Sequence, residues 1–161
     1  MARNVHVQLT PGSRGKITAA ELRRVARGVL AAEDVAPAVE VEVVLANEAT
    51  VRDLNRLYRG KDEPTDVLSF AEADVAATFR SPDDARPSLG EIVICLPIAE
   101  SQASSAGRLV AGELAHLLTH GLLHLLGYDH EDDEAESQRM KAREDQLLAS
   151  LGYAGRYAHG H

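Results

Sequence analysis

Residues 113–130 read ELAHLLTHGLLHLLGYDH, a leucine-rich stretch with regularly spaced histidines. Its leucines leave hardly any polar side, and a helix that is apolar all round is typical of a protein interior. His116, His120 and His124 follow one another at intervals of four residues, so on a helix they form one row. The pattern predicts one buried helix over about residues 109–126 that carries three imidazoles on a single stripe.

This row of histidines predicts a metal site. Buried imidazoles cost desolvation energy unless each has a partner, and His120 and His124, one turn apart, can bind the same ion. Gly127 can end the helix in the left-handed conformation, so that the chain turns back and His130 reaches the site. We predict one divalent ion, preferably zinc, bound by His120, His124 and His130. Three imidazoles leave one coordination position open, as in catalytic zinc sites.

The spacing H-x3-H-x2-G-x2-H matches the zinc-binding metzincin pattern HExxHxxGxxH except at position 121, which is Gly rather than Glu. In zincin proteases that Glu is the general base acting on the metal-bound water. Its absence disfavours a metallopeptidase and leaves the metal site intact. Hydrolysis of another substrate is therefore the preferred interpretation.

Other candidate groups carry weaker expectations. His116 lies one turn before the metal motif, and support of a ligand, contact with substrate and no role at all stay open. Asp129 can orient a ligand or cap a turn. Cys95 lies in an apolar run and is expected to be a buried thiol. His159 and His161 belong to a carboxyl-terminal tail and are expected to be inert.

The rest of the chain indicates an α+β domain. Alternating apolar residues or short apolar runs predict four strands, at residues 5–9, 39–45, 67–70 and 91–96. Helical spacing predicts further helices over residues 18–32, 47–60, 97–107 and 131–151. The order β-α-β-α-β-β-α-α-α favours a single domain over residues 1–161, a small mixed four-stranded sheet packed with about five helices. Residues 71–89 are expected to form a poorly ordered surface excursion.

Composition is that of a soluble globular protein, with 45% hydrophobic and 26% charged residues among 161. The first ten residues contain no signal peptide, and no apolar run is long enough to span a membrane. We therefore expect a cytoplasmic protein. The net charge is −8, but residues 1–61 hold ten Lys/Arg against seven Asp/Glu. This asymmetry can form a basic face for an anionic partner, or it is ordinary solvated helix surface.

Three blocks, in order, resemble the YbeY family of single-strand-specific, metal-dependent endoribonucleases. They are HGLLHLLGYDH at residues 120–130, NRLYRGKDEPTDVLSF at 55–70 and LGEIVI at 89–94; Asp133-Glu134-Ala135 followed by Met140 also fits. The resemblance implies His120, His124 and His130 as zinc ligands and Arg59 as the functional arginine. It also implies processing of the 3′ end of small-subunit rRNA, ribosome quality control, and single-stranded RNA and the ribosome as partners, without DNA or membrane.

A mechanism can be outlined as a hypothesis. The ion activates a water or polarises a phosphoryl oxygen, while the planar, permanently charged Arg59 binds a phosphate. Basic residues of the amino-terminal half are expected to bind the RNA backbone. Whether the 2′-OH or a water attacks stays open. Without the resemblance, Arg59 could simply be a solvated helix end. The competing function is a ribosome-associated RNA-binding protein whose zinc is purely structural.

Overall fold

The structure, a computed structural model, describes residues 4–72, 87–128 and 133–153. Four strands form one sheet in the order β1-β2-β4-β3. They are β1 (Asn4–Gln8), β2 (Glu40–Ala46), β3 (Val67–Ala71) and β4 (Ser88–Cys95). The strands β1, β2 and β4 run parallel, and β3 pairs antiparallel with β4. The expected mixed four-stranded sheet is confirmed.

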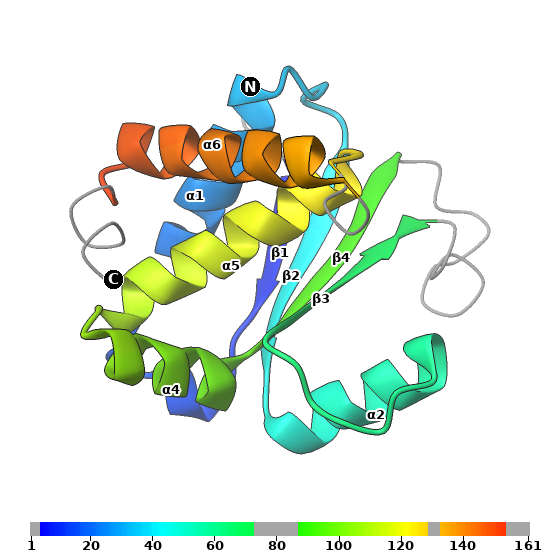
Figure 1. The fold of residues 1–161 in the computed structure, drawn as a ribbon, viewed down its shortest axis with the longest axis vertical. Coiled ribbons are helices and arrows are strands. Elements are labelled where there is room, and N and C mark those ends of the chain that lie inside the picture. Colours follow the sequence, from blue (N-terminus) through cyan, green and yellow to red (C-terminus); the bar gives the residue numbers. More distant parts are fainter. Residues whose placement is uncertain (1–3, 73–86, 129–132, 154–161) are drawn as a thin grey trace.

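The described residues form five α-helices, as expected from the sequence. They are α1 (Ala19–Ala32), α2 (Glu48–Arg59), α4 (Leu96–Ala106), α5 (Val110–Leu125) and α6 (Glu134–Ser150), with a 3₁₀ turn at Pro11–Ser13. Figure 1 shows α5 running across the sheet, with α1 and α6 beside it. None of these helices is long and apolar enough to cross a membrane, within the ranges that the structure describes.

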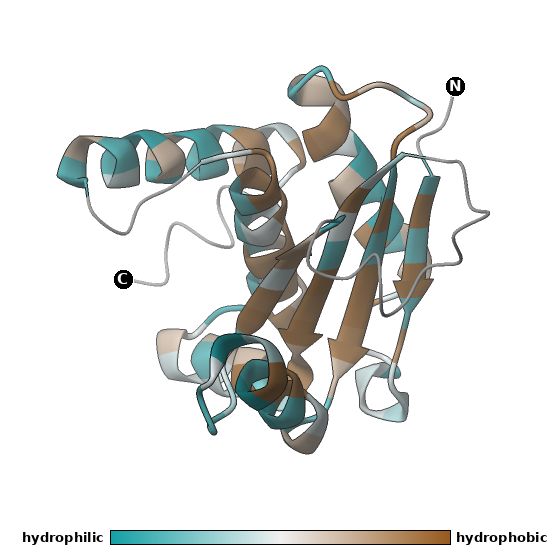
Figure 2. Cartoon of the chain, turned by 90° about the vertical axis from the view of Figure 1, so that its right-hand side faces the viewer, coloured by the Kyte–Doolittle hydropathy of each residue, from teal (hydrophilic) through white to brown (hydrophobic). Residues whose placement is uncertain are grey.

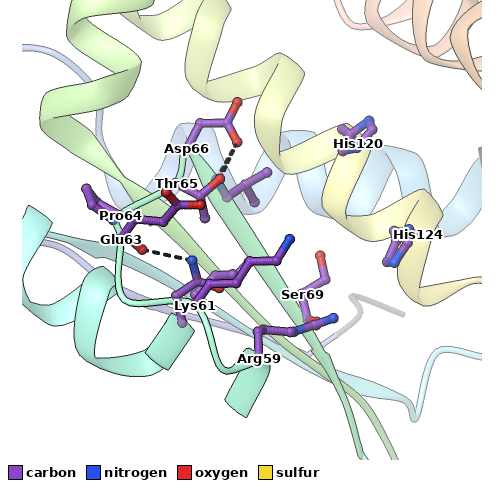
Figure 3. Close-up of a pocket in the computed structure, with 12 residues that line it drawn as sticks. Arg59, Lys61, Glu63, Pro64, Thr65, Asp66, Ser69, His120 and His124 are labelled. Carbon is purple, nitrogen blue, oxygen red and sulfur yellow. Dashed lines mark hydrogen bonds between the residues drawn. The ribbon is translucent and has the colours of Figure 1, made fainter. Parts of the chain in front are cut away.

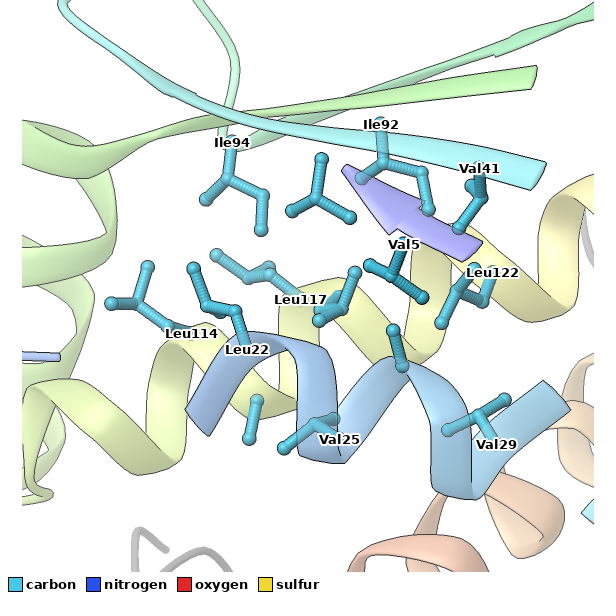
Figure 4. Packing of buried hydrophobic residues seen from close by; sticks show 14 of the residues in the cluster. Val5, Leu22, Val25, Val29, Val41, Ile92, Ile94, Leu114, Leu117 and Leu122 are labelled. Atoms are coloured by element: carbon cyan, nitrogen blue, oxygen red, sulfur yellow. The ribbon is translucent and has the colours of Figure 1, made fainter. Parts of the chain in front are cut away.

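The sheet has an apolar layer on each face, because successive side chains of a strand point to opposite sides. Ile92 and Ile94 of β4 belong to the main core, which they share with α1 and α5; Figure 4 shows these side chains interlocking. Val93 and Cys95 belong to a second, smaller cluster with Val51 of α2. Hydrophobic residues accordingly concentrate on the strands and the central helix, whereas α6 is largely hydrophilic (Figure 2). Cys95 is buried, as expected.

Local capping groups set the ends of several helices. The Thr18 and Asn47 side chains accept hydrogen bonds from Glu21 N and Thr50 N at 3.1 and 2.8 Å, and such side-chain caps satisfy otherwise unpaired backbone donors. Gly60 ends α2 in the left-handed conformation, with φ 72°. The last helix is capped by Asp133 and begins at Glu134, slightly later than the expected start at about residue 131.

Strand β4 begins at Ser88, three residues before the predicted start. Gly90, which precedes the apolar run in the sequence, lies inside the strand with φ 141°. A Cβ there would lie 2.1 Å from the Phe70 carbonyl oxygen, so only glycine permits this close approach of β3. The expected surface excursion over residues 71–89 is therefore too wide at both ends, and its centre, 73–86, lies outside the described residues.

Candidate active site

A pocket of about 460 Å³ brings the two halves of the predicted site together. Its lining comes from the end of α2, the following loop, β3 and α5: Asn55, Arg59, Lys61, Glu63, Pro64, Thr65, Asp66, Val67, Leu68, Ser69, His120 and His124. In Figure 3, Arg59 and Lys61 extend into the pocket from one side, and His120 and His124 lie on α5 across from them. The arginine and the histidines therefore share one cavity, although about sixty residues separate them in the chain.

The turn after α5 has the geometry expected from the sequence. Gly127 has φ 103°, its N–H donates to the His124 carbonyl at 3.1 Å, and Tyr128 N donates to the Leu123 carbonyl at 3.0 Å. These two bonds form a Schellman motif, which reverses the chain at a helix end. The Tyr128 hydroxyl also donates to Glu33, the residue directly after α1, at 2.8 Å, which anchors Tyr128.

The two helical ligand candidates lie in this pocket, while the third lies outside the described residues. His130 and Asp129 both fall in residues 129–132. Within residues 4–72, 87–128 and 133–153, no group of three possible ligands is assembled. His120 and His124 nevertheless fit a divalent ion, because they are one turn apart on the same pocket wall. Two of the three predicted ligands thus line the pocket, and the ligand set stays a prediction.

A carboxylate from α6 contacts two histidines of α5. Glu144 lies 3.0 Å from His116 Nε2 and 2.6 Å from His120 Nδ1. A carboxylate only accepts hydrogen bonds, so Nδ1 of His120 carries the proton. In the neutral imidazole, a proton on Nδ1 leaves Nε2 with the lone pair that a metal ion needs. His116, whose role the sequence left open, therefore contacts the same carboxylate as His120.

Burial and hydrogen bonding have opposite effects on the pKa values of Glu144 and His116. Burial alone raises the pKa of Glu144, but hydrogen bonds from His116 and His120 outweigh it and lower the pKa to about 2. Burial alone lowers the pKa of His116, but Glu113 and Glu144 outweigh it and raise the pKa to about 9. Glu113 is itself paired with Arg108 at 3.0 Å. Helices α5 and α6 are thus joined by largely buried, opposite charges.

Glu144 was missed from the sequence, although a signal for it exists. It lies four residues after Met140 and three before Leu147, both on the apolar inner face of the last helix. An acidic residue at that position faces the interior and needs a buried partner. The row of histidines in the neighbouring helix is the natural candidate for that partner.

The structure explains why residue 121 is glycine. A Cβ at Gly121 would lie 3.1 Å from both Ile92 Cγ2 and Ser69 Oγ, closer than ordinary packing. The Ser69 hydroxyl also donates to the Gly121 carbonyl at 3.3 Å. The helix lies directly against β3 and β4 here, so the general base of a metallopeptidase would collide with the sheet. This geometry weighs further against that alternative.

Arg59 is more than a solvated helix end. It is exposed, but its Nη2 donates to the Ser69 carbonyl oxygen, and its guanidinium lies over the Phe70 ring, 5.5 Å from the centroid. These contacts direct the side chain along β3 toward the pocket. The loop after it is held by Asn55, whose amide donates to the Glu63 carbonyl at 2.8 Å.

The basic residues of α1 are differently placed from those of the pocket. Arg23 donates to the Val5 carbonyl at 3.2 Å, and Arg24 pairs with Glu21 at 2.7 Å and donates to the Leu151 carbonyl. The hydrogen bond with Glu21 raises the pKa of Arg24. Arg23 and Arg24 thus make contacts within the chain, whereas the cations that line the pocket are Arg59 and Lys61.

The fold and the pocket define a class: an α+β domain with histidines on a buried helix facing cations suited to an anionic substrate. Residues 11–152 match the family described as Endoribonuclease YbeY. The chain therefore belongs to the YbeY endoribonuclease family. This confirms the resemblance seen in the sequence and, with it, the enzyme class of a hydrolytic endoribonuclease.

Individual relatives cover most of the chain. An Endoribonuclease YbeY of Roseiflexus sp. (strain RS-1) is 43% identical over 150 residues, 93% of this chain and 94% of the relative. That of Moorella thermoacetica is 46% identical, covering 81% and 85%. The solution structure of TM1509 from Thermotoga maritima aligns with a TM-score of 0.61 at 28% identity, covering 97% of this chain and 94% of the other.

Proposed function

We propose that this chain is a single-strand-specific, zinc-dependent endoribonuclease. Its role would be to process the 3′ end of small-subunit rRNA in the cytoplasm and to take part in ribosome quality control. Its substrates and partners would be single-stranded RNA, rRNA and the ribosome, with no DNA or membrane partner and a single catalytic domain over residues 1–161. The observation that carries this proposal is the shared pocket of Arg59, Lys61, His120 and His124.

One zinc ion would be bound by His120, His124 and His130. When bound, such an ion supplies a Lewis acid beside the scissile phosphate and neutralises developing negative charge. The histidines line an open pocket rather than a closed core, and structural zinc sites are usually closed. This favours catalysis over the alternative of an RNA-binding protein with a purely structural zinc.

The remaining steps belong to the chain's own side chains. Arg59 is permanently charged, and its fork can donate to two phosphate oxygens at once. Its contacts with Ser69 and Phe70 already restrict the side chain, so less conformational freedom is lost when a phosphate binds. Lys61 adds a second positive charge to the same wall, so a phosphodiester would be bound between these cations and the histidines.

The proposal is tested by cleavage of labelled single-stranded RNA, with duplex RNA and single-stranded DNA of the same sequence as controls. We expect only the single-stranded RNA to be cut, loss of cleavage with a chelator, and recovery on adding zinc. His124→Ala should lose tight zinc binding and cleavage while retaining the wild-type circular dichroism spectrum. If His124→Ala instead unfolds and no longer binds RNA, the result would support the alternative in which the zinc is purely structural. Undiminished cleavage after complete metal removal would contradict the proposed chemistry.

A further inference from the structure

The apolar inner face of α6 carries one buried acidic residue, Glu144. Met140, Leu147 and Leu148 on that face are almost fully buried and apolar. Glu144 lies among them with only 8% of its side chain exposed. A carboxylate in such a place is costly unless every acceptor is satisfied. Its position therefore calls for a reason beyond the packing of α6.

That reason lies in the two histidines it joins. One carboxylate oxygen is 3.0 Å from His116 Nε2, and the other is 2.6 Å from His120 Nδ1. His116 has a second carboxylate near its other nitrogen, Glu113 at 4.0 Å from Nδ1. Arg108 pairs with Glu113 at 3.0 Å. The result is a largely buried row of alternating basic and acidic groups that begins just before α5 and ends at His120, on the pocket wall, and its last part, from His116 through Glu144 to His120, is hydrogen-bonded.

We propose that Glu144 is a positioning residue for the metal site: its carboxylate holds the proton on Nδ1 of His120 and thereby presents Nε2 to the ion. The proposal rests on the proposed function, in which His120 is a ligand. Histidine ligands commonly donate their second N–H to a carboxylate, which fixes both the tautomer and the ring orientation. His116 acts indirectly, by occupying the other carboxylate oxygen and preventing Glu144 from rotating away.

A glutamine could not replace this carboxylate. Glu144 accepts through two different oxygens, whereas an amide has one acceptor oxygen and an NH₂ group that would face a ring N–H. Either His116 or His120 would lose its acceptor. A free rotation of the His120 ring, or the tautomer with the proton on Nε2, would then compete with metal binding.

The test compares Glu144→Gln with Asp145→Asn, which makes the same change of charge at the next, exposed position of α6. Zinc affinity is measured by competition with a chromophoric chelator, alongside thermal melting of each metal-free protein. We expect about 10- to 100-fold weaker binding for Glu144→Gln, no more than about a twofold change for Asp145→Asn, and an intermediate value for Glu144→Asp. Wild-type zinc affinity in a folded Glu144→Gln variant would overturn the inference.

The tautomer can be measured in the wild-type protein, so the proposal does not depend on any variant folding. Nitrogen-15 NMR of the metal-free chain, with His120 assigned by His120→Gln, should show the proton on Nδ1; a proton on Nε2 would refute the proposed role of Glu144. His120→Gln also separates the two hypotheses. If it retains full zinc affinity, the ligand assignment in the proposed function fails. If it loses zinc while Glu144→Gln does not, only the positioning role fails.

Discussion

Arg59 shows how a single residue can be both anchored and available. It is the last residue of α2, where Gly60 ends the helix, and it is held by the Ser69 carbonyl and the Phe70 ring. Its backbone therefore belongs to a stable helix end, while its charged group reaches the pocket. An exposed side chain in this position contributes little to stability, so its effects on folding and on turnover are separable.

Arg59→Ala should leave zinc content and melting temperature close to wild type, yet lower single-turnover RNA cleavage by roughly a hundredfold or more. Arg59→Lys should recover only part of the rate, because it keeps the charge but loses the planar fork. Arg56→Ala is the matched control: Arg56 is exposed on the same helix, lies 3.6 Å from Asp53 and is not part of the pocket lining. A normal single-turnover rate for Arg59→Ala would remove it from the catalytic site.

At the scale of an element, α5 is the helix on which the site is built. It contacts the sheet along one side and α1, α4 and α6 along others. The close approach at Gly121 lets the helix lie against β3 and β4, and the Schellman turn after it redirects the chain. Both features depend on a residue without a side chain, so they should be sensitive to the smallest substitution.

Gly121→Ala should destabilise the protein by about 1 to 3 kcal/mol, the usual cost of an extra methyl group in a tightly packed place. Chemical denaturation of the metal-free protein measures this directly. In the double variant Ser69→Ala, Gly121→Ala part of the loss should be recovered, because one of the two closest atoms is Ser69 Oγ. If the loss of unfolding free energy in the double variant equals the sum of the losses in the two single variants, α5 and β3 are not in close contact at this point.

At the scale of the whole molecule, buried ion pairs make the contact between α5 and α6 dependent on pH. Burial lowers the pKa of His116, but Glu113 and Glu144 outweigh burial and raise the pKa from 6.5 to about 9. The protonated imidazole therefore stabilises the folded state, fully below about pH 6.5, and this contribution is lost as pH rises toward 9. The pKa of Glu144 is lowered from 4.5 to about 2, so its contribution is present above about pH 4.5 and is lost as pH falls toward 2.

Metal-free wild-type protein should lose roughly 1 to 3 kcal/mol of unfolding free energy between about pH 6.5 and 9. Denaturant titrations across that range measure the slope. His116→Gln should be less stable at pH 6.5 and nearly independent of pH above it. His6→Gln is the control, since His6 on β1 is about half exposed and its loss should leave the slope in place. An unchanged slope in His116→Gln would contradict the assigned charge state.

Much of the fold could be predicted because the signals are local. Apolar periodicity, capping side chains and terminal glycines act within a few residues of each other, so α1, α2 and α5 were found close to their true bounds. The row of histidines on a buried helix and the turn at Gly127 rest on equally local signals, and both are confirmed. The complete ligand set stays a prediction, since His130 lies outside the described residues.

Other features depend on partners that lie far apart in the chain. The strand order β1-β2-β4-β3 depends on pairing between segments that no local pattern connects. Likewise, Glu144 meets His120 only because α6 packs across α5, and Arg59 reaches the histidines' pocket only because β3 pairs with the inner strand β4. Local patterns were sufficient to predict which helices and strands form, because helix and strand signals are short-range. Their mutual placement needed the folded chain, since packing and hydrogen bonding between distant segments depend on distances that one-dimensional spacing does not contain.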